Sequence, residues 1–506
     1  MTSQRVARPS RVGRGTSAFP LAAAAGLWIG GCAVGPDYQR PEPAAPMRGE
    51  FSSKAESVER SSTVGAALPD PAWWGVLNDP TLTSLIGDAI VANYDLRIAE
   101  SRVRQARAAR GIAESAGLPQ VGSGASYQRS RDSENVPQGS FGNNSSSGRD
   151  TYFAGLDASW ELDFFGGIRR SVEAATADVQ AAEETRRDVL VTLTAEVASN
   201  YVELRGVQRR IAVTQDNINV QTETLELVRS RFNAGLVSEL DVAQATAQLA
   251  TTSAVLPRLE IRLKESMHRI GVLCGKQPGE LVEALAVTAP IPEAPAEVPV
   301  GLPSDLLRRR PDIRRAERAV AAATARIGEA TADLYPRFSL TGAFGLRSDQ
   351  VGNFFEGDSR FWSIGPALRW PIFQGGRIRS NIRLQEALTD EQISAYQRAV
   401  LGALEDVENA LVGFNREQAT RRFLSDAAEA NNRAVELSNQ LYRAGLTDFQ
   451  RVLDSQRSLV VAEEALAASD AAVVQALIRL YKALGGGWEV GEPTTEQAAT
   501  DQSTRP

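Results

Sequence analysis

Few residues in this chain have the type and spacing that catalysis needs. His268 is the only histidine among the 506 residues, and the sequence contains neither a Walker loop nor cysteines and histidines at metal-ligand spacing. Cys274 is expected to be a buried structural thiol. The three glycines at 485–487 follow a long helical pattern, so we expect them to end a helix rather than to hold a phosphate. The sequence therefore predicts no enzyme, no metal site and no cofactor other than a covalent lipid.

Three acidic residues share one face of an expected strand. Asp157, Glu161 and Asp163 are separated by even numbers of residues, and such residues point to the same side of a strand. No partner acid or base accompanies them, so we expect them to line a water-filled lumen rather than to catalyse. A pore with this lining is expected to prefer cations mildly.

The beginning of the chain has the composition of a bacterial lipoprotein signal. Four arginines precede an apolar stretch, 19–29, that is too short to span a bilayer. The stretch ends in Ile29-Gly30-Gly31-Cys32, small residues followed directly by a cysteine. We expect residues 1–31 to be removed and Cys32 to become lipidated, each buried CH₂ adding roughly 0.8 kcal/mol of membrane affinity. The alternative is an ordinary secretory signal that precedes a cysteine by coincidence.

Charge and composition exclude some classes of protein. Residues 1–31 hold four arginines and no acid, so their removal changes the net charge from −7 to −11. An acidic chain without a basic stripe argues against nucleic acid as a partner. With Cys32 lipidated, Cys274 has no second cysteine for a disulfide. Aromatic residues make up only 6%, which suits long, thin helices better than a thick globular core.

The chain contains an internal duplication. Residues 160–169 align with 370–379, both beginning with tryptophan, and residues 95–100 align with 312–317. Because the sequence contains two copies of one arrangement of helices and strands, the expected fold is described for each repeat separately. We assign 81–275 to the first repeat and 303–488 to the second. The other expected parts are an anchor and extended tether at 32–80, a proline-rich linker at 276–302 and a disordered tail at 489–506.

Each repeat is expected to contain a helix, two strands, a long helix and a final helix. In the first repeat the expected helices are 81–117, 168–232 and 239–273, and the strands are 121–131 and 151–164. In the second repeat the helices are 303–334, 378–442 and 448–484, and the strands are 336–347 and 360–373. At 1.5 Å per residue, each long helix extends roughly 100 Å. Pro257 is expected to kink or break its helix, because proline lacks the backbone N–H.

The final helix carries a seven-residue apolar repeat, which is the coiled-coil period. The apolar positions are Val452, Leu459, Leu466, Val473 and Leu480. Gln456, Glu463 and Asp470 interrupt this seam, and alanine is frequent around it. Small and partly polar seams suit helices that form a curved, hollow wall with a wet side.

The expected strands alternate between apolar and polar residues. One face of the strand at 151–164 is formed by Tyr152, Ala154, Leu156, Ala158, Trp160, Leu162 and Phe164. Such alternation over about ten residues, with aromatic residues at the ends, is typical of transmembrane barrel strands. A half-buried soluble sheet is the alternative, but no segment of the chain supplies an opposing core layer.

Four strands cannot close a barrel by themselves, and lipid does not tolerate open sheet edges. The chain must therefore form oligomers in which several copies contribute strands to one wall. Two copies would supply eight strands and three copies twelve. The strand pattern alone does not choose between them.

Several segments resemble the outer membrane factors of bacterial tripartite multidrug efflux systems, in the lipoprotein branch of the TolC/OprM/NodT type. They are Cys32 with Gly35-Pro36-Asp37-Tyr38, the run 301–317, the turn 373–378, and 453–457 with 481–488. The resemblance implies a trimer, in which a twelve-stranded outer membrane barrel continues into a twelve-helix periplasmic tunnel. It also implies a passive exit duct that works with a periplasmic adaptor and a proton-driven inner-membrane pump of the resistance-nodulation-division (RND) type.

The resemblance also implies a gate at the periplasmic tip, formed by a ring of aspartates. Asp454 matches that aspartate and Arg457 follows one turn later, whereas Gln450 replaces an apolar leucine of the family. The alternative is an ordinary surface pair at spacing i,i+3. The two tip turns, Ala234-Gly235-Leu236 and Ala444-Gly445-Leu446, resemble the ends that dock on the adaptor. A plain helix reversal with left-handed glycine explains the turns equally well.

The sequence is also compatible with other functions. A similar duct could serve protein secretion by a type I system or metal export. A protein of a different class, a structural coiled-coil lipoprotein that spaces two membranes, would contain the same helices. Conductance separates a duct from a spacer, and the genes beside this one would identify the pump.

Overall fold

The computed structural model describes residues 33–42, 51, 63–65, 67, 70–131 and 148–491. Cys32, the signal segment and residues 492–506 of the expected tail lie outside the described residues. The chain divides into two compact units, and each unit contains residues from both repeats. Of the described residues, unit 1 contains 33–37, 112–131, 148–173 and 325–385, and unit 2 contains 38–42, 51, 63–65, 67, 70–111, 174–324 and 386–491.

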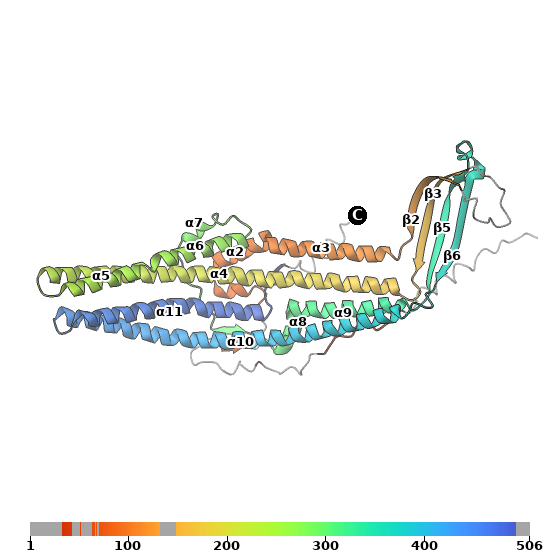
Figure 1. The fold of residues 1–506 in the computed structure, drawn as a ribbon. Coiled ribbons are helices and arrows are strands. Elements are labelled where there is room, and N and C mark those ends of the chain that lie inside the picture. Colours follow the sequence, from red (N-terminus) through yellow and green to blue (C-terminus); the bar gives the residue numbers. More distant parts are fainter. Residues whose placement is uncertain are drawn as a thin grey trace, which may run out of the picture. The chain divides into compact units, whose positions relative to one another are not determined.

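Long helices dominate the chain (Figure 1). The first repeat contains α2 (Pro80–Ala92), α3 (Tyr94–Ser115), α4 (Gly167–Asn233), α5 (Glu239–Ser253) and α6 (Leu256–Leu273). The second repeat contains α8 (Leu306–Arg309), α9 (Pro311–Ala332), α10 (Arg377–Arg443) and α11 (Phe449–Ala483). The helices α4 and α10 have 67 residues each and occupy equivalent positions in the two repeats. Among the described residues, no helix is both long enough and apolar enough to cross a membrane.

Unit 1 contains one four-stranded antiparallel sheet, which confirms the four expected strands (Figure 1). The strands are β2 (Gln120–Ser130), β3 (Arg149–Leu162), β5 (Arg337–Ser348) and β6 (Arg360–Arg369), in the order β2-β3-β5-β6. The expected last strand is too long, because β6 ends at Arg369 and not at Phe373. Pro371 follows shortly after this end and has no N–H to continue the ladder.

The remaining elements of the described chain are short. They are α7 (Val282–Ala286), the short helices η2 (Trp73–Leu77), η3 (Pro303–Asp305), η4 (Val351–Asn353), η5 (Gly357–Ser359) and η6 (Glu489–Gly491), and a parallel pair formed by β1 (Thr63–Gly65) and β4 (Glu297–Pro299). The pair β1–β4 joins the tether to the linker between the repeats. The linker is thus part of unit 2.

The first helix of each repeat is broken, which corrects the single helices expected at 81–117 and 303–334. Asn93 separates α2 from α3 and has extended backbone angles, as does Arg310 between α8 and α9. The Asn93 side chain caps α3, because its Oδ1 accepts hydrogen bonds from the N–H groups of Asp95 and Leu96. Arg310 precedes Pro311, and the residue before a proline is disfavoured in a helix.

The two breaks receive equivalent contacts from the last helix of their repeat. The Asn93 side-chain amide donates to the carbonyl of Leu273 at 2.9 Å, and an Arg310 guanidinium N–H donates to the carbonyl of Ala483 at 3.0 Å. In both repeats, the break in the first helix is therefore hydrogen-bonded to the end of the last helix, although different residues donate the hydrogen bonds. Around it lies the main core of unit 2, where Trp73 stacks on Tyr481 with ring centroids 5.2 Å apart.

The helix expected to bend at Pro257 is two helices. The first, α5, ends at Ser253, and α6 begins at Leu256. Pro257 lies in the first turn of α6, where backbone N–H groups have no partner within the helix, so the proline costs no hydrogen bond.

Two tryptophans brace the sheet of unit 1 against the helices that precede it. The indole N–H of Trp160 donates to the carbonyl of Gly117 at 2.9 Å, and that of Trp370 donates to the carbonyl of Leu334 at 3.1 Å. Trp160 and Trp370 are equivalent in the duplication. Each tryptophan therefore fixes the end of a strand to the end of the helix before that strand pair.

Candidate functional site

The three expected gate residues lie on successive turns of α11 in unit 2. The Gln450 amide donates to Asp454 Oδ1 at 3.0 Å, and an Arg457 guanidinium nitrogen lies 3.8 Å from the same oxygen. The side chains of Asp454 and Arg457 are 61% and 50% exposed. The three residues that were predicted from the sequence to form the gate thus lie close together, on a solvent-exposed part of α11.

A fourth residue joins this group from another helix. The Arg457 Nε–H donates to Gln248 Oε1 on α5 at 2.8 Å. Arg457 therefore interacts both with Asp454 on its own helix and with Gln248 on the neighbouring helix α5. No sequence signal pointed to Gln248, since it lies 209 residues away and belongs to no recognised motif.

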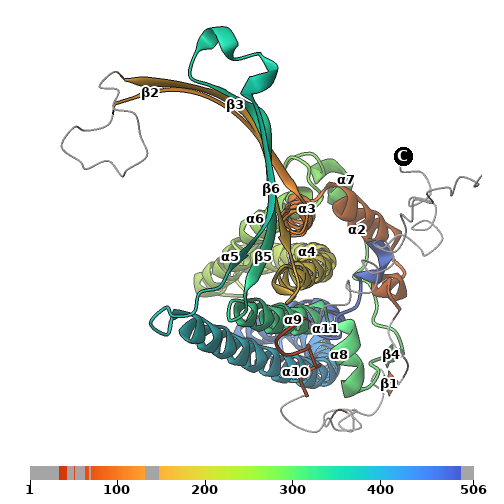
Figure 2. The ribbon, with the colours of Figure 1, turned by 90° about the vertical axis from the view of Figure 1, so that its right-hand side faces the viewer.

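The polar residues that interrupt the apolar seam of α11 all have partners on neighbouring helices. Gln456 bonds Thr224 at 3.0 Å, Glu463 bonds Asn217 at 2.8 Å, and Asp470 bonds Arg421 at 2.6 Å. Thr224 and Asn217 belong to α4 and Arg421 to α10. Polar pairs in a coiled-coil seam fix the register of the helices. Figure 2 shows α4, α5, α10 and α11 gathered side by side when viewed end-on.

The two expected adaptor tips are helix reversals with left-handed glycines. Gly235 has φ +73° and Gly445 has φ +72°, values at which a side chain would be strained. Leu236 and Leu446, which follow them, are 72% and 75% exposed. Ala234 and Ala444 complete the turns, and all six residues are exposed at the ends of helix pairs.

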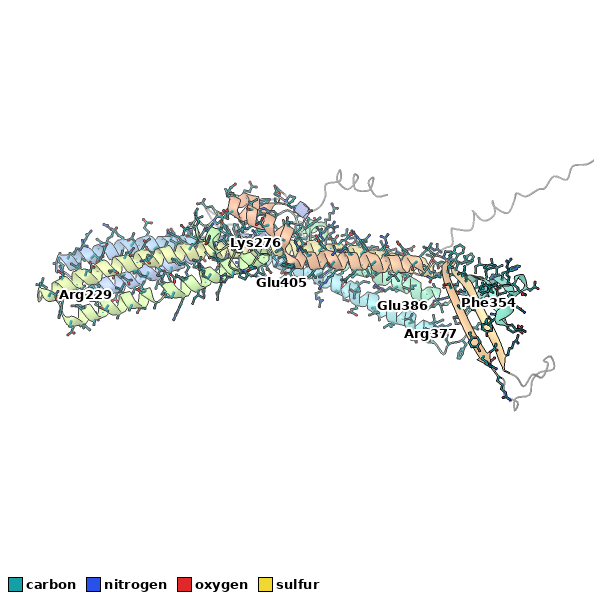
Figure 3. All side chains as sticks on the ribbon, turned by 90° about the horizontal axis from the view of Figure 1, so that it is seen from above. Arg229, Lys276, Phe354, Arg377, Glu386 and Glu405 are labelled. Atoms are coloured by element: carbon teal, nitrogen blue, oxygen red, sulfur yellow. The ribbon has the colours of Figure 1, made fainter. Side chains whose placement is uncertain are left out.

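Arg231 ties the two tips together. It is on α4, and its guanidinium donates to the carbonyls of Tyr442 at 3.0 Å and of Arg443 at 2.9 Å, the last residues of α10. Its guanidinium also lies over the Tyr442 ring, 4.6 Å from the centroid. In Figure 3, Arg229 of α4 labels this end of unit 2, whereas Glu405 of α10 and Lys276, which follows α6, are labelled far from it.

The three acids expected to line a lumen have different environments in unit 1. Asp157 lies on β3 opposite Gly122 and Ala343. Glu161, also on β3, has a carboxylate oxygen 4.0 Å from an Arg337 nitrogen.

Asp163 lies beyond the end of β3, which corrects its expected place on the strand. Its oxygens accept from the backbone N–H groups of Ile168 and Arg169 at 3.2 and 2.9 Å. An acidic side chain at this position stabilises the positive end of the helix dipole. Asp163 thus caps α4, and its charge is partly balanced by the Arg169 side chain at 3.3 Å.

Cys32 lies outside the described residues, but the segment that follows it is firmly held in unit 1. Arg170 of α4 donates from Nε to the carbonyl of Val34 at 3.1 Å and from a terminal nitrogen to Asp37 at 2.7 Å. The Val34 N–H donates to the carbonyl of Phe165 at 3.1 Å. The Arg170 side chain is only 5% exposed. We call Arg170 with residues 33–37 the anchor clamp.

Glycine 328 of α9 makes room for the anchor clamp. A Cβ at Gly328 would lie 2.8 Å from the Arg170 side chain. Gly35 has φ +91°, and a Cβ there would collide with the Gly328 backbone. Sequence reasoning noted Gly35-Pro36-Asp37-Tyr38 as a motif but missed both Arg170 and Gly328. The glycine before a proline was the available signal for a close backbone approach.

Arg170→Ala is expected to release the segment that follows Cys32. Loss of the hydrogen bonds to Val34 and Asp37 should raise the hydrogen-exchange rate of the Val34 amide at least about tenfold. Arg379→Ala is the control, because Arg379 is an exposed arginine near the start of α10 in the same unit. Equal exchange rates in both variants would show that Arg170 does not hold this segment.

A family model described as "Outer membrane efflux protein" matches residues 85–276 and 302–486 of the chain. The chain belongs to this family. The two matched stretches correspond to the two repeats, and the unmatched part between them is the linker.

Relatives of this outer membrane efflux protein match along almost the whole chain. Nodulation protein T of Rhizobium leguminosarum bv. trifolii is 35% identical over 466 residues, covering 91% of this chain and 96% of the relative. The pyoverdine export outer membrane protein OpmQ of Pseudomonas putida is 34% identical over 429 residues, covering 85% and 90%. The solved structure of the outer-membrane channel OprN is 36% identical, with a TM-score of 0.83, and covers 90% of this chain and 100% of that one.

These matches confirm the predicted family, the mostly helical fold with four antiparallel strands, and the outer membrane location. The family consists of channels, so the efflux protein is not an enzyme. Within the residues that the structure describes, no group of three or more His, Cys, Asp or Glu could hold a metal ion.

Proposed function

We propose that three copies of this efflux protein form one passive exit duct through the outer membrane. The proposal is carried by the sheet of unit 1, whose one face is apolar and exposed. The exposed apolar residues on that face are Leu156, Trp160, Phe344, Trp362, Ile364 and Leu368. An exposed apolar face of this kind, with tryptophans near its ends, is what lipid covers in transmembrane strands.

The edges of the sheet support an oligomer. In the described part of the chain, β2 pairs only with β3 and β6 pairs only with β5. In lipid, the free N–H and C=O groups of both edges must find partners. Pairing of β2 in one copy with β6 in the next satisfies both edges at once. Three copies then supply twelve strands to one closed wall, which is the number that the family resemblance implies.

The lipid anchor and the anchor clamp act together in this proposal. An acylated Cys32 inserts into the outer membrane lipid, and Arg170 holds the next five residues against α4. The acyl chains are therefore kept beside unit 1, which carries the membrane strands.

The partners are a periplasmic adaptor and an inner-membrane RND pump that uses the proton gradient. The exposed Leu236 and Leu446 support docking of the adaptor, because apolar side chains at rigid tips favour binding over solvation. The similarity to the pyoverdine export protein OpmQ and to the outer-membrane channel OprN supports a role in efflux. The duct itself supplies no energy.

The gate is assigned to Asp454, Arg457 and Gln450. Three copies of an exposed Asp454 facing a common axis would narrow the bore and attract cations. The contact of Arg457 with Gln248 holds α11 against α5, so opening requires the two helices to separate.

Planar lipid bilayers test the proposed function. The purified efflux protein is expected to produce discrete conductance steps, and deletion of its gene should sensitise cells to exported compounds. A structural coiled-coil spacer would produce no conductance steps, and that outcome would contradict the duct. A duct for type I protein secretion would conduct but would leave drug sensitivity unchanged, while protein export would be lost.

A further inference from the structure

An arginine and two phenylalanines meet on one face of the sheet in unit 1. Phe153 of β3 is directly opposite Arg347 of β5, and Phe361 of β6 is opposite Gly345. Residues opposite one another in antiparallel strands point to the same side, as do residues two apart. Arg347 and the two rings therefore share the face of Asp157 and not the apolar face.

The two rings hold the guanidinium of Arg347. Its central carbon lies 5.6 Å from the centroid of the Phe153 ring and 5.1 Å from that of Phe361. The two rings are 5.7 Å apart and tilted by 36°. Such cation–π contacts restrict an arginine without neutralising its charge.

Arg347 has no carboxylate partner within the described ranges, and its side chain is exposed. Two other arginines of unit 1 do have carboxylate partners, since Arg337 pairs with Asp333 and Arg169 pairs with Asp163. The charge of Arg347 is thus available to a ligand. A guanidinium binds carboxylate and sulfonate groups through two parallel hydrogen bonds.

A row of glycines lies beneath the two rings. Gly124, Gly155 and Gly345 are in register across three strands. A Cβ at Gly155 would be 3.3 Å from the Phe153 ring, and one at Gly345 would be 3.0 Å from the Phe361 ring. The rings therefore lie close to the backbone of the glycine row, and both phenylalanines are only half-buried, which leaves part of each accessible to solvent. An aromatic solute can stack on this accessible part.

We propose that Arg347, Phe153 and Phe361 form a binding site for aromatic organic anions on the wall of the exit duct. The site rests on the proposed function, because it assigns this face of the sheet to the lumen. The acid group of the solute binds Arg347, and its ring packs on the phenylalanines. Three such sites, one per copy, would bind anionic solutes in a lumen that Asp157 and Glu161 otherwise make acidic.

Direct binding tests the site without depending on conductance. The probe is 2-naphthalenesulfonate, whose fluorescence is titrated with the detergent-solubilised protein. Arg347→Gln is expected to weaken its binding at least about tenfold, because one charged hydrogen-bonding group is lost. Arg149→Gln is the matched control, since Arg149 lies on the same face of β3 and loses the same charge. Binding should stay within about twofold of the wild type in this control.

A second variant separates the rings from the charge. Phe153→Leu with Phe361→Leu keeps Arg347 and should weaken binding of 2-naphthalenesulfonate but not that of cyclohexanesulfonate. If Arg149→Gln weakens binding as much as Arg347→Gln, only general electrostatics act and the site is rejected. The site is also rejected if the wild type does not bind the probe.

Block of single-channel current locates the site. The wild-type current should fall reversibly when the probe is added, and Arg347→Gln should abolish this block without lowering the conductance. Binding that depends on Arg347 but gives no block would leave the site standing and would contradict the assignment of this face to the lumen. Block that does not depend on Arg347 would reject the site and leave the duct intact.

Discussion

Replacing Gly345 by valine is expected to reduce the amount of assembled channel in the outer membrane at least about tenfold. Gly345 is buried in the middle of the sheet, opposite Gly155 of β3 and Phe361 of β6. A Cβ at this position would collide with the Ala154 carbonyl oxygen and the Gly155 backbone. Backbone atoms cannot rotate away as a flexible side chain can, so β3 and β5 must separate. The amount of assembled channel is measured in isolated outer membranes by native electrophoresis.

Gly365→Val is the matched control for this prediction. Gly365 lies on β6 in the same sheet, and a Cβ there would meet nothing within 4 Å. Valine is a good strand former, so this variant should assemble normally. Normal assembly of Gly345→Val would show that the glycine row is not needed for the sheet to form.

Removing both charges of the gate, Asp454→Ala with Arg457→Ala, is expected to raise single-channel conductance roughly twofold or more. The double variant loses the contacts of Asp454 with Gln450 and Arg457, and it loses the bond from Arg457 to Gln248 on α5. The tip of α11 is then free to move away from α5. Cells that carry the variant should become sensitive to large antibiotics that the closed tip excludes.

A second exposed pair of the same spacing provides the control. Arg433 and Glu436 on α10 form an i,i+3 ion pair at 2.7 Å, with side chains 65% and 52% exposed. Arg433→Ala with Glu436→Ala removes the same kinds of charge from unit 2 and should leave conductance unchanged. Unchanged conductance in the Asp454 and Arg457 variant would remove these residues from the gate.

The duplication made the long elements predictable. Both 67-residue helices were expected within one residue at each end, because glycine turns mark their limits in both repeats. The four strands followed from alternation, which lipid on one face and water on the other impose on a sequence.

The breaks at Asn93 and Arg310 were missed for a physical reason. Each break depends on a carbonyl from a distant helix, supplied by Leu273 in one case and Ala483 in the other. At Asn93, local helical propensity continues through the break, so only the tertiary contact reveals it. Pro311 was the one local warning, since proline disfavours helix at the residue before it.

The candidate sites also differ in whether their residues are close together or far apart in the sequence. Gln450, Asp454 and Arg457 lie within two turns of one helix, so sequence could bring them together. Gln248 and the anchor clamp join residues that are far apart in the chain, and no spacing rule predicts such contacts. The structure also shows what Gln450 contributes in place of the leucine of the family. Its side-chain amide donates a hydrogen bond to Asp454, which a leucine could not do.

The mass of the detergent-solubilised protein tests the central claim most directly, since that claim is that β2 and β6 find their missing partners in neighbouring copies. Native mass spectrometry of the protein extracted from outer membranes is expected to give three chains per particle. A stable particle of one chain would contradict the shared wall, and with it the proposed duct.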